Sequence, residues 1–227
     1  MTLAPLSGPG IIYATGKITK PEALSVDLFT KWYHEVHIPD VFKTGAATAS
    51  FRYESTIPTK VNHPYLSIYP LPELSAIQSE AFSKVPVTHE MLPGPTRHIL
   101  DFAEFDTRFY AIVKTFERNG AKKGPAPVIT TITFNPPVDQ QNVQAWIEKS
   151  FIPFLSANPT FVRLRLYKLA LGTTPTAPPS HLILLETEGA GSGLVIPGAE
   201  HGTFGLFKSI GDVNVDFEAR RTGESRI

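Results

Sequence analysis

The chain has 227 residues, 42% of them hydrophobic, and its 21 basic and 21 acidic residues leave a formal net charge of zero. This balance disfavours nucleic-acid and membrane-surface proteins, which carry a basic excess, and the absence of cysteine excludes a disulfide framework, a zinc ribbon and a thiol nucleophile. The sequence shows neither a signal peptide nor an apolar run of about 18 residues, so we expect a cytoplasmic protein without a membrane segment.

The first half of the chain predicts six elements in the order β-α-β-β-α-β. Strands are expected at 11–18, 49–56, 65–71 and 107–117, where β-branched and aromatic residues concentrate, and a second helix is expected at 74–82. The first helix carries the apolar stripe Leu28, Phe29, Trp32, Tyr33 and Val36, with Ser25 or Asp27 as its N-cap. Ile38 precedes a proline, which predicts an end or a kink of this helix near that residue. Residues 84–102 contain proline and glycine and are expected to form a loop.

A polar, glycine- and proline-containing linker at 119–127 is followed by the same order of elements. Strands are expected at 128–134, 160–170, 181–188 and 213–221, and helices at 143–156 and 202–211. On the strand 160–170, alternation places Arg163, Arg165 and Tyr167 on one face. Two arginines on one strand face could hold a carboxylate, although an ion-paired or solvated edge is the simpler interpretation.

The two halves keep a constant spacing. Trp32 and Trp146, Pro39 and Pro153, and Tyr53 and Tyr167 are each 114 positions apart. The sequence therefore predicts an α+β fold of two tandem ferredoxin-like β-α-β-β-α-β repeats, residues 1–118 and 128–227, with 119–127 as a linker. Packing the two sheets against each other would cover both bare sheet faces within one chain.

The duplicated unit, with a first helix that ends YHEVHIPDV, resembles the dimeric α/β-barrel superfamily and most closely its EthD-like branch. The element His37-Ile38-Pro39 matches the His-x-Pro of that branch, and the likeness of the motif covers about residues 27–45. Members of the superfamily usually build the barrel from two chains. The resemblance therefore implies an intrachain dimeric α/β-barrel here, either as a monomer with an internal pseudo-dimer or as a weak homodimer.

The resemblance also implies a pocket for a small molecule between a sheet and its helices. Many relatives decarboxylate, cyclise, dehydrate or oxygenate aromatic and polyketide-like compounds without a cofactor. We therefore expect a cofactor-independent decarboxylase, cyclase, dehydratase or isomerase for a hydrophobic, oxygenated substrate, in secondary metabolism or aromatic degradation. The alternatives are a non-catalytic small-molecule-binding or stress-type protein of the same fold, and a haem-dependent relative.

His37 is the leading candidate for a general acid/base, because imidazole exchanges a proton near neutral pH and this residue borders the apolar stripe of its helix. Further catalytic candidates are Tyr53, as a phenolic proton donor, and His89 and His98, although two solvated loop histidines are the simpler interpretation. The candidates for substrate binding are aromatic residues that would equally suit a core: Tyr13, Phe29, Trp32, Tyr33 and Phe42. At the position that corresponds to His37, the second copy has Phe151. We therefore expect at most one half-site of the histidine type.

Other motifs predict no further chemistry. His34 lies three residues before His37 on the helix, but no third ligand is evident, so no metal site is expected. The segment GAGSG at 189–193 lacks the Lys-Ser/Thr and the following helix of a phosphate-binding loop and predicts a flexible loop. No Gly-x-Ser-x-Gly or His-Glu-x-x-His motif occurs, so the sequence gives no support for a serine hydrolase or a zincin.

Overall fold

A computed structural model describes residues 6–121, 124–136, 142–173, 178–189 and 200–206. Eight antiparallel strands close into one barrel in the order β1-β3-β2-β8-β5-β7-β6-β4. The strands are β1 (Gly10–Ile18), β2 (Phe51–Ser55), β3 (Tyr65–Leu71), β4 (Ala103–Glu117), β5 (Val128–Phe134), β6 (Phe161–Gly172), β7 (His181–Thr187) and β8 (Glu200–Leu206). The fold is thus mixed α+β with a curled antiparallel sheet.

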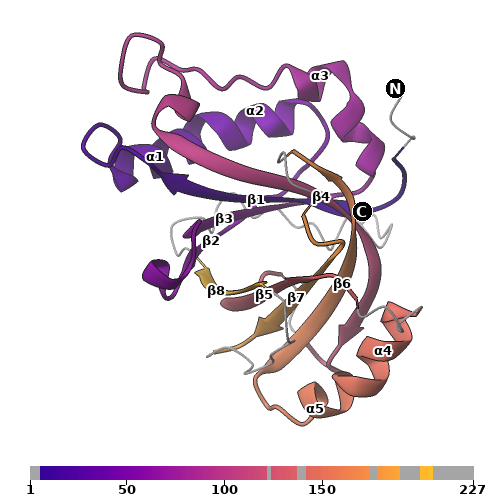
Figure 1. The fold of residues 1–227 in the computed structure, drawn as a ribbon. Helices are drawn as coiled ribbons and strands as arrows, with labels where there is room; N and C mark the ends of the chain where they lie inside the picture. The colour runs from indigo at the N-terminus through magenta and orange to yellow at the C-terminus, as the bar shows by residue number, and fades with distance from the viewer. Residues whose placement is uncertain (1–5, 122–123, 137–141, 174–177, 190–199, 207–227) are drawn as a thin grey trace, which may run out of the picture.

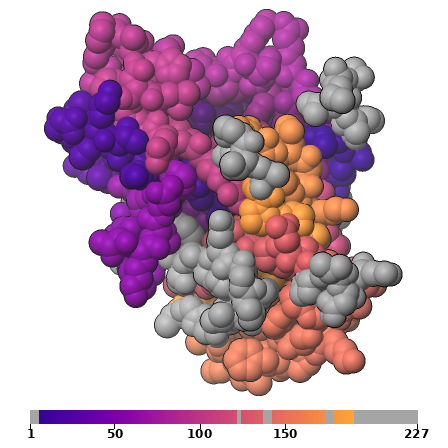
Figure 2. All heavy atoms as spheres, in the orientation of Figure 1, coloured from indigo at the N-terminus to yellow at the C-terminus, as the bar shows by residue number. Residues whose placement is uncertain are grey.

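Each half of the chain contributes four neighbouring strands. The N-terminal strands stand in the order β4-β1-β3-β2, and the C-terminal strands in the order β8-β5-β7-β6. The barrel closes where the halves meet, through pairing of β4 with β6 and of β2 with β8. Figure 2 shows one face of the molecule, with the N-terminal half (indigo to magenta) above the C-terminal half (coral and orange).

Helices cover the outside of the barrel on opposite sides (Figure 1). The N-terminal sheet carries α1 (Val26–Trp32), a π-helical turn (Tyr33–His37), α2 (Ile38–Lys43), a 3-10 helix (Leu74–Gln78) and α3 (Glu80–Ser83). The C-terminal sheet carries α4 (Val143–Ser150) and α5 (Ile152–Ser156). Two further 3-10 turns lie at Pro58–Lys60 and Ile99–Asp101. Among the described residues, no helix is long and apolar enough to cross a membrane.

Strand alternation separates three cores. Residues such as Ile12 and Phe109 pack under the N-terminal helices, and residues such as Ile132 and Leu164 pack under α4 and α5. A third cluster combines side chains of both halves and fills the barrel interior: Ile11, Tyr13, Tyr53, Leu66, Ile68, Tyr110, Ile129, Tyr167, Leu182 and Leu184. The interior is therefore a packed core, as expected for a barrel of eight strands.

The barrel interior also holds a buried ion cluster. Arg163 Nε lies 3.4 Å from Glu186 Oε2, and the side chains of Arg163 and Glu186 are only 2% and 4% exposed. Arg165 Nη1 contacts Glu186 Oε1. Arg163 and Arg165 thus share one strand face with Tyr167, as the alternation predicts, and their partner is a carboxylate of this same chain.

One predicted element is wrong. The helix expected at 202–211 is a strand over Glu200–Leu206, paired with β5 and β2. Its glycines, Gly202 and Gly205, disfavour a helix, and two neighbouring strands supply backbone partners that local sequence cannot reveal. The strand expected at 213–221 lies outside the described residues. The other expected strands are confirmed with shifted ends, and so are the other helices, except that the segment 74–82 divides at Ser79 into a 3-10 helix and α3.

Candidate functional site

The helix that carries His37 is built around a local defect. Ser25 caps its start, accepting a hydrogen bond from the backbone N–H of Leu28 at 3.2 Å. Pro39 has no N–H to continue the α-helical ladder, and the N–H of Ile38 bonds to the carbonyl of Tyr33, five residues back. The expected kink is therefore a π-turn, and the helix continues to Lys43. His37 is the last residue of this wider turn.

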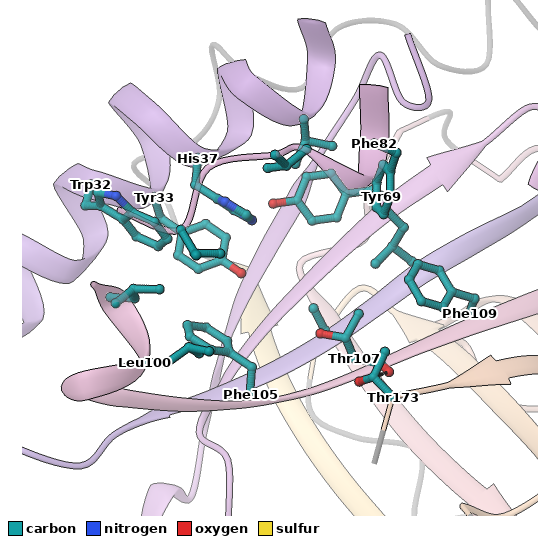
Figure 3. Close-up of a pocket in the computed structure, with 16 residues that line it drawn as sticks. Trp32, Tyr33, His37, Tyr69, Phe82, Leu100, Phe105, Thr107, Phe109 and Thr173 are labelled. Carbon is teal, nitrogen blue, oxygen red and sulfur yellow. Dashed lines mark hydrogen bonds between the residues drawn. The ribbon is translucent and has the colours of Figure 1, made fainter. Parts of the chain in front are cut away.

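A cavity of about 320 Å³ lies between this helix and the outer face of the N-terminal sheet. Its walls are mainly aromatic and aliphatic. It is lined by Ile12, Ala14, Trp32, Tyr33, His37, Val41, Tyr69, Phe82, Val85, Val87, Ile99, Leu100, Phe105, Thr107, Phe109 and Thr173 (Figure 3). Its volume is at the lower end of the range typical for small-molecule sites.

His37 is held by aromatic neighbours. Its ring stacks on Trp32 at 5.1 Å between centroids and meets the Tyr33 ring edge-on at 4.9 Å. Burial lowers the pKa of His37 from 6.5 to about 4, with Arg52 acting in the same direction and Asp40 against it. The imidazole is therefore neutral at physiological pH. Its Nδ1 is buried and has no hydrogen-bond partner among the described residues.

Two phenol groups accompany the imidazole. Figure 3 shows the Tyr69 hydroxyl and the His37 ring pointing toward one another, with the Tyr33 hydroxyl entering the cavity beside them. Burial raises the pKa of Tyr33, and Arg52 and the hydroxyls of Ser67 and Tyr69 lower it in part. Burial also raises the pKa of Tyr69 well above its usual value. Both phenols are therefore protonated at neutral pH and can donate hydrogen bonds.

A contact between the halves also lines the cavity. Thr173, just beyond β6, donates a hydrogen bond from its hydroxyl to the carbonyl of Thr107 on β4 at 2.9 Å. Both residues line the cavity, so the C-terminal half contributes to a site that otherwise belongs to the N-terminal half. The cavity thus combines polar groups from both halves with mainly apolar walls.

Of the predicted site residues, His37, Trp32 and Tyr33 line this cavity. Tyr13 and Tyr53 point the other way, into the barrel interior. Tyr13 meets Tyr110 edge-on at 6.0 Å, and the Tyr53 hydroxyl donates a hydrogen bond to the carbonyl of Ala126 at 3.3 Å. The sheet therefore separates both tyrosines from His37.

The remaining aromatic candidates belong to the core around the site. Phe29 is fully buried and packs against Tyr33 at 5.4 Å and Tyr65 at 5.3 Å between ring centroids. Phe42 is partly buried against the same core. Neither residue lines the cavity.

His89 and His98 organise the segment that covers the cavity without lining it. Nδ1 of His89 accepts a hydrogen bond from the N–H of Met91 at 3.2 Å. Nδ1 of His98 accepts one from the N–H of Leu100, also at 3.2 Å. The structure therefore gives both histidines a local role in the backbone turns of this loop.

His34 contacts an arginine of the sheet. Its Nε2 lies 3.4 Å from Nη1 of Arg52, and His34 does not line the cavity. In the part of the chain that the structure describes, no group of three histidines, aspartates or glutamates could hold a metal ion.

Several functional candidates were missed from the sequence, chief among them Tyr69 and Arg52. Strand alternation could have identified Tyr69, because Tyr69 pairs with Ile12, which lies on the sheet face beneath the helix. Alternation also separates Arg52 from Tyr53, but the sequence does not say which face meets the first helix. The loop residues Val85, Val87 and Leu100 had no comparable signal, because their placement depends on how residues 84–102 fold back.

The second copy replaces the imidazole with a hydrocarbon ring. Phe151 meets Trp146 edge-on at 5.1 Å between centroids, the same separation as between His37 and Trp32. The backbone at Phe151 interrupts the helix between α4 and α5, where the first copy continues through a π-turn. The corresponding position in the second copy therefore lacks an acid/base group.

The buried imidazole predicts an acid-sensitive stability. Between pH 6.5 and about 4 the unfolded chain binds a proton at residue 37 that the folded chain does not bind. Stability should therefore fall as the pH is lowered through this window, by up to about 3 kcal/mol from this group. Urea unfolding at pH 7 and pH 4 should show a smaller acid loss for His37→Phe, by roughly that amount. An equal acid loss in the two proteins would contradict the buried, neutral state of His37.

Comparison with known proteins gives a partial sequence relative. A scan against protein-family models finds no match. The chain is 27% identical over 127 residues to core atranone cluster (CAC) protein 1 of Stachybotrys chlorohalonatus. The match covers 56% of this chain and 53% of that protein, so the chain spans about half the length of this curated relative.

Solved structures share the fold. An anthrone oxidase-like protein matches with a TM-score of 0.50 at 12% identity, covering 88% of this chain and 91% of that chain. A proposed monooxygenase from Fusobacterium nucleatum matches with a TM-score of 0.50 at 9% identity, covering 91% and 94% of the two chains. At these levels of identity, the two matches show that this chain shares its overall fold with those proteins.

Proposed function

We propose that this chain is a cofactor-independent enzyme that acts on a hydrophobic, oxygenated aromatic or polyketide-like small molecule, with His37 as its general acid/base. The observation that carries this proposal is a neutral imidazole that faces a phenol hydroxyl inside an apolar cavity. Such a cavity, with a few convergent polar groups, is the usual form of a small-molecule site.

The first chemical step would be a proton transfer. The neutral imidazole of His37 accepts a proton from an acidic C–H or O–H of the substrate. The Tyr33 and Tyr69 hydroxyls donate hydrogen bonds to the oxygen on which negative charge then develops. Walls such as Phe105 and Phe109 exclude water, which strengthens both interactions. The imidazolium can later return the proton to another atom of the substrate.

Several reactions share this first step. Decarboxylation, cyclisation, dehydration and isomerisation of a polyketide-like compound each need proton transfer next to an oxygenated carbon. The descriptions of the two similar structures, an anthrone oxidase-like protein and a proposed monooxygenase, add oxygenation to these. The partial likeness to a protein of the core atranone cluster supports a role in secondary metabolism.

The haem-dependent alternative fits the described residues less well. A haem iron would need open space in front of a nitrogen of His37, where Figure 3 shows the Tyr69 hydroxyl. The cavity of about 320 Å³ is also small for a porphyrin and its propionates. Haem addition should therefore produce no Soret band shift, and a shift that His37→Phe abolishes would favour the haem-dependent alternative.

We also infer that the barrel is built from two tandem ferredoxin-like repeats, 1–118 and 128–227, joined by 119–127. The corresponding strand orders β4-β1-β3-β2 and β8-β5-β7-β6 support this inference. The pairings β4–β6 and β2–β8 support it too, because each joins the fourth strand of one half to the second strand of the other half. The EthD-like affinity remains a proposal based on His37-Ile38-Pro39.

The experiment that tests the enzyme proposal incubates a small-molecule extract of the producing cells with wild type and with His37→Phe. Mass spectrometry should show a species that disappears only with wild type, and a product that differs by carbon dioxide, water or oxygen or only in retention time. A species that both proteins deplete and release unchanged on denaturation would instead establish the non-catalytic binding protein. If both proteins consume the same species and form a new product, His37 is not required for the reaction.

A further inference from the structure

Arg52 places a positive charge directly behind the site. It lies on β2, facing the helix, and is fully buried at 0% exposure. Its guanidinium carbon lies 4.3 Å from the centroid of the Tyr33 ring and 5.6 Å from that of Phe29. Its Nη1 lies 3.4 Å from His34 Nε2. Arg52 does not line the cavity, so it can act on a ligand only through the residues that do.

The groups between Arg52 and the cavity are neutral. Burial keeps the pKa of Tyr33 and Tyr69 raised, and it keeps the pKa of His37 low. Arg52 opposes the first two shifts and adds to the third, so both phenols and the imidazole experience its charge. Because the site is buried, this charge is weakly screened.

Among the residues that the structure describes, three acidic groups near this region are engaged, exposed or on the strand of Arg52 itself. Asp40 on α2 accepts a hydrogen bond from Lys43 at 2.7 Å. Glu35, in the π-turn, is 58% exposed at its side chain and lies 4.0 Å from Lys31. Glu54, two residues beyond Arg52 on the same strand, favours the charged guanidinium. The pKa of the half-buried His34 is lowered by burial and by Arg52, so this residue adds no charge at neutral pH.

We propose that Arg52 is a positioning residue that makes the cavity selective for weak acids of the phenol or enol class, which bind as anions with their oxygen at the Tyr33 and Tyr69 hydroxyls. This inference rests on the site of the proposed function and names the charge state of its ligand. The guanidinium stacked on Tyr33 polarises that phenol, so its hydroxyl becomes a stronger donor to an anionic oxygen.

An anionic ligand would also change the pKa of His37, the proposed acid/base group. A negative charge beside His37 offsets the effect of Arg52 and raises the pKa of the imidazole toward neutrality. The imidazole then becomes a stronger base in the complex than in the free protein, and the proton that it can accept is that of a C–H or of a second O–H of the bound anion. Proton transfer would thus be favoured only when a ligand of the correct charge is present.

The test uses 4-nitrophenol, whose phenolate absorbs visible light and whose neutral form does not. The absorption of the bound dye is titrated against pH in wild type, Arg52→Met, Arg52→Lys and Tyr33→Phe. Wild type should bind the phenolate at least about tenfold more tightly than the phenol, so the pKa of the bound dye falls by about one unit. The proton released by the dye passes to the solvent and is counted in the titration.

The variants separate charge from packing. Arg52→Met keeps a long, buried side chain without charge and should lose the pKa shift while still binding the dye. Arg52→Lys should keep part of the shift, and Tyr33→Phe should lose most of it while leaving Arg52 in place. An unshifted or raised pKa in wild type, a shift that survives in Arg52→Met, or no binding of the dye to wild type would overturn the proposal.

This outcome is independent of the test of turnover. If the pKa of the bound dye is lowered but no substrate is consumed, the anion-selective cavity is supported and the enzyme proposal is rejected. If turnover depends on His37 but the pKa of the dye is not lowered, the enzyme proposal is supported and the role of Arg52 is rejected.

Discussion

Replacing His37 with phenylalanine is expected to lower kcat/KM for the compound that the wild type consumes by about 10²–10⁴-fold, the usual contribution of a general acid/base. Phenylalanine preserves the ring that stacks on Trp32, and the chain itself has Phe151 at the corresponding position of the second copy. The substitution therefore removes the proton acceptor with little change in packing. Steady-state kinetics on the species identified from the extract would measure this loss.

The matched control is His89→Asn. The amide oxygen of asparagine can accept the hydrogen bond that His89 Nδ1 receives from the N–H of Met91, and this residue does not line the cavity. We expect the control to retain kcat/KM within about twofold, the level of an ordinary surface change. Equal losses in the two variants would show that the effect is structural, and full activity of His37→Phe would refute the catalytic role.

Removing the carboxylate of Glu186 is expected to cost about 3–5 kcal/mol of unfolding free energy, because it removes the buried counter-charge of the buried Arg163. Glu186 lies 3.4 Å from Arg163 Nε and also contacts Arg165, inside the barrel. The side chain of Arg163 is 2% exposed, so water cannot replace the lost partner. Urea unfolding of Glu186→Ala at pH 7 would measure the change.

Glu117→Ala provides the control for this cluster. Glu117 lies 3.2 Å from Arg163 Nε, but its own side chain is 48% exposed. Pairs that water can reach contribute little, so we expect a loss below about 1 kcal/mol. Similar losses of unfolding free energy in the two variants would mean that burial does not determine how much each ion pair contributes to stability.

The pattern of the first half of the chain predicted its fold well. Apolar periodicity at 28–36 and the proline at 39 were sufficient to locate the helix and its defect, because both effects are local. The strand Glu200–Leu206 was missed for the opposite reason. Its glycines already weakened the helix prediction, but the pairing with β5 and β2 that makes it a strand is not visible in the local sequence.

The site was predicted only in part. His37 and Tyr33 were found because they lie on one helix, where spacing determines direction. Tyr13 and Tyr53 were assigned to the same site because alternation defines two faces of a strand without saying which one meets the helix. Arg52 shows the same limit, since its neighbour Tyr53 points into the barrel while Arg52 lies beneath the helix.

The closure of the barrel within one chain changes what mutation can do. In a symmetric pair of identical subunits, each amino-acid change appears on both sides at once, so a polar group gained in one cavity is forced on the other. Here positions 37 and 151 are encoded separately, and they hold an imidazole and a benzyl group. One half can therefore carry a polar side chain that packs less favourably, while the other half keeps an apolar side chain that stabilises the fold.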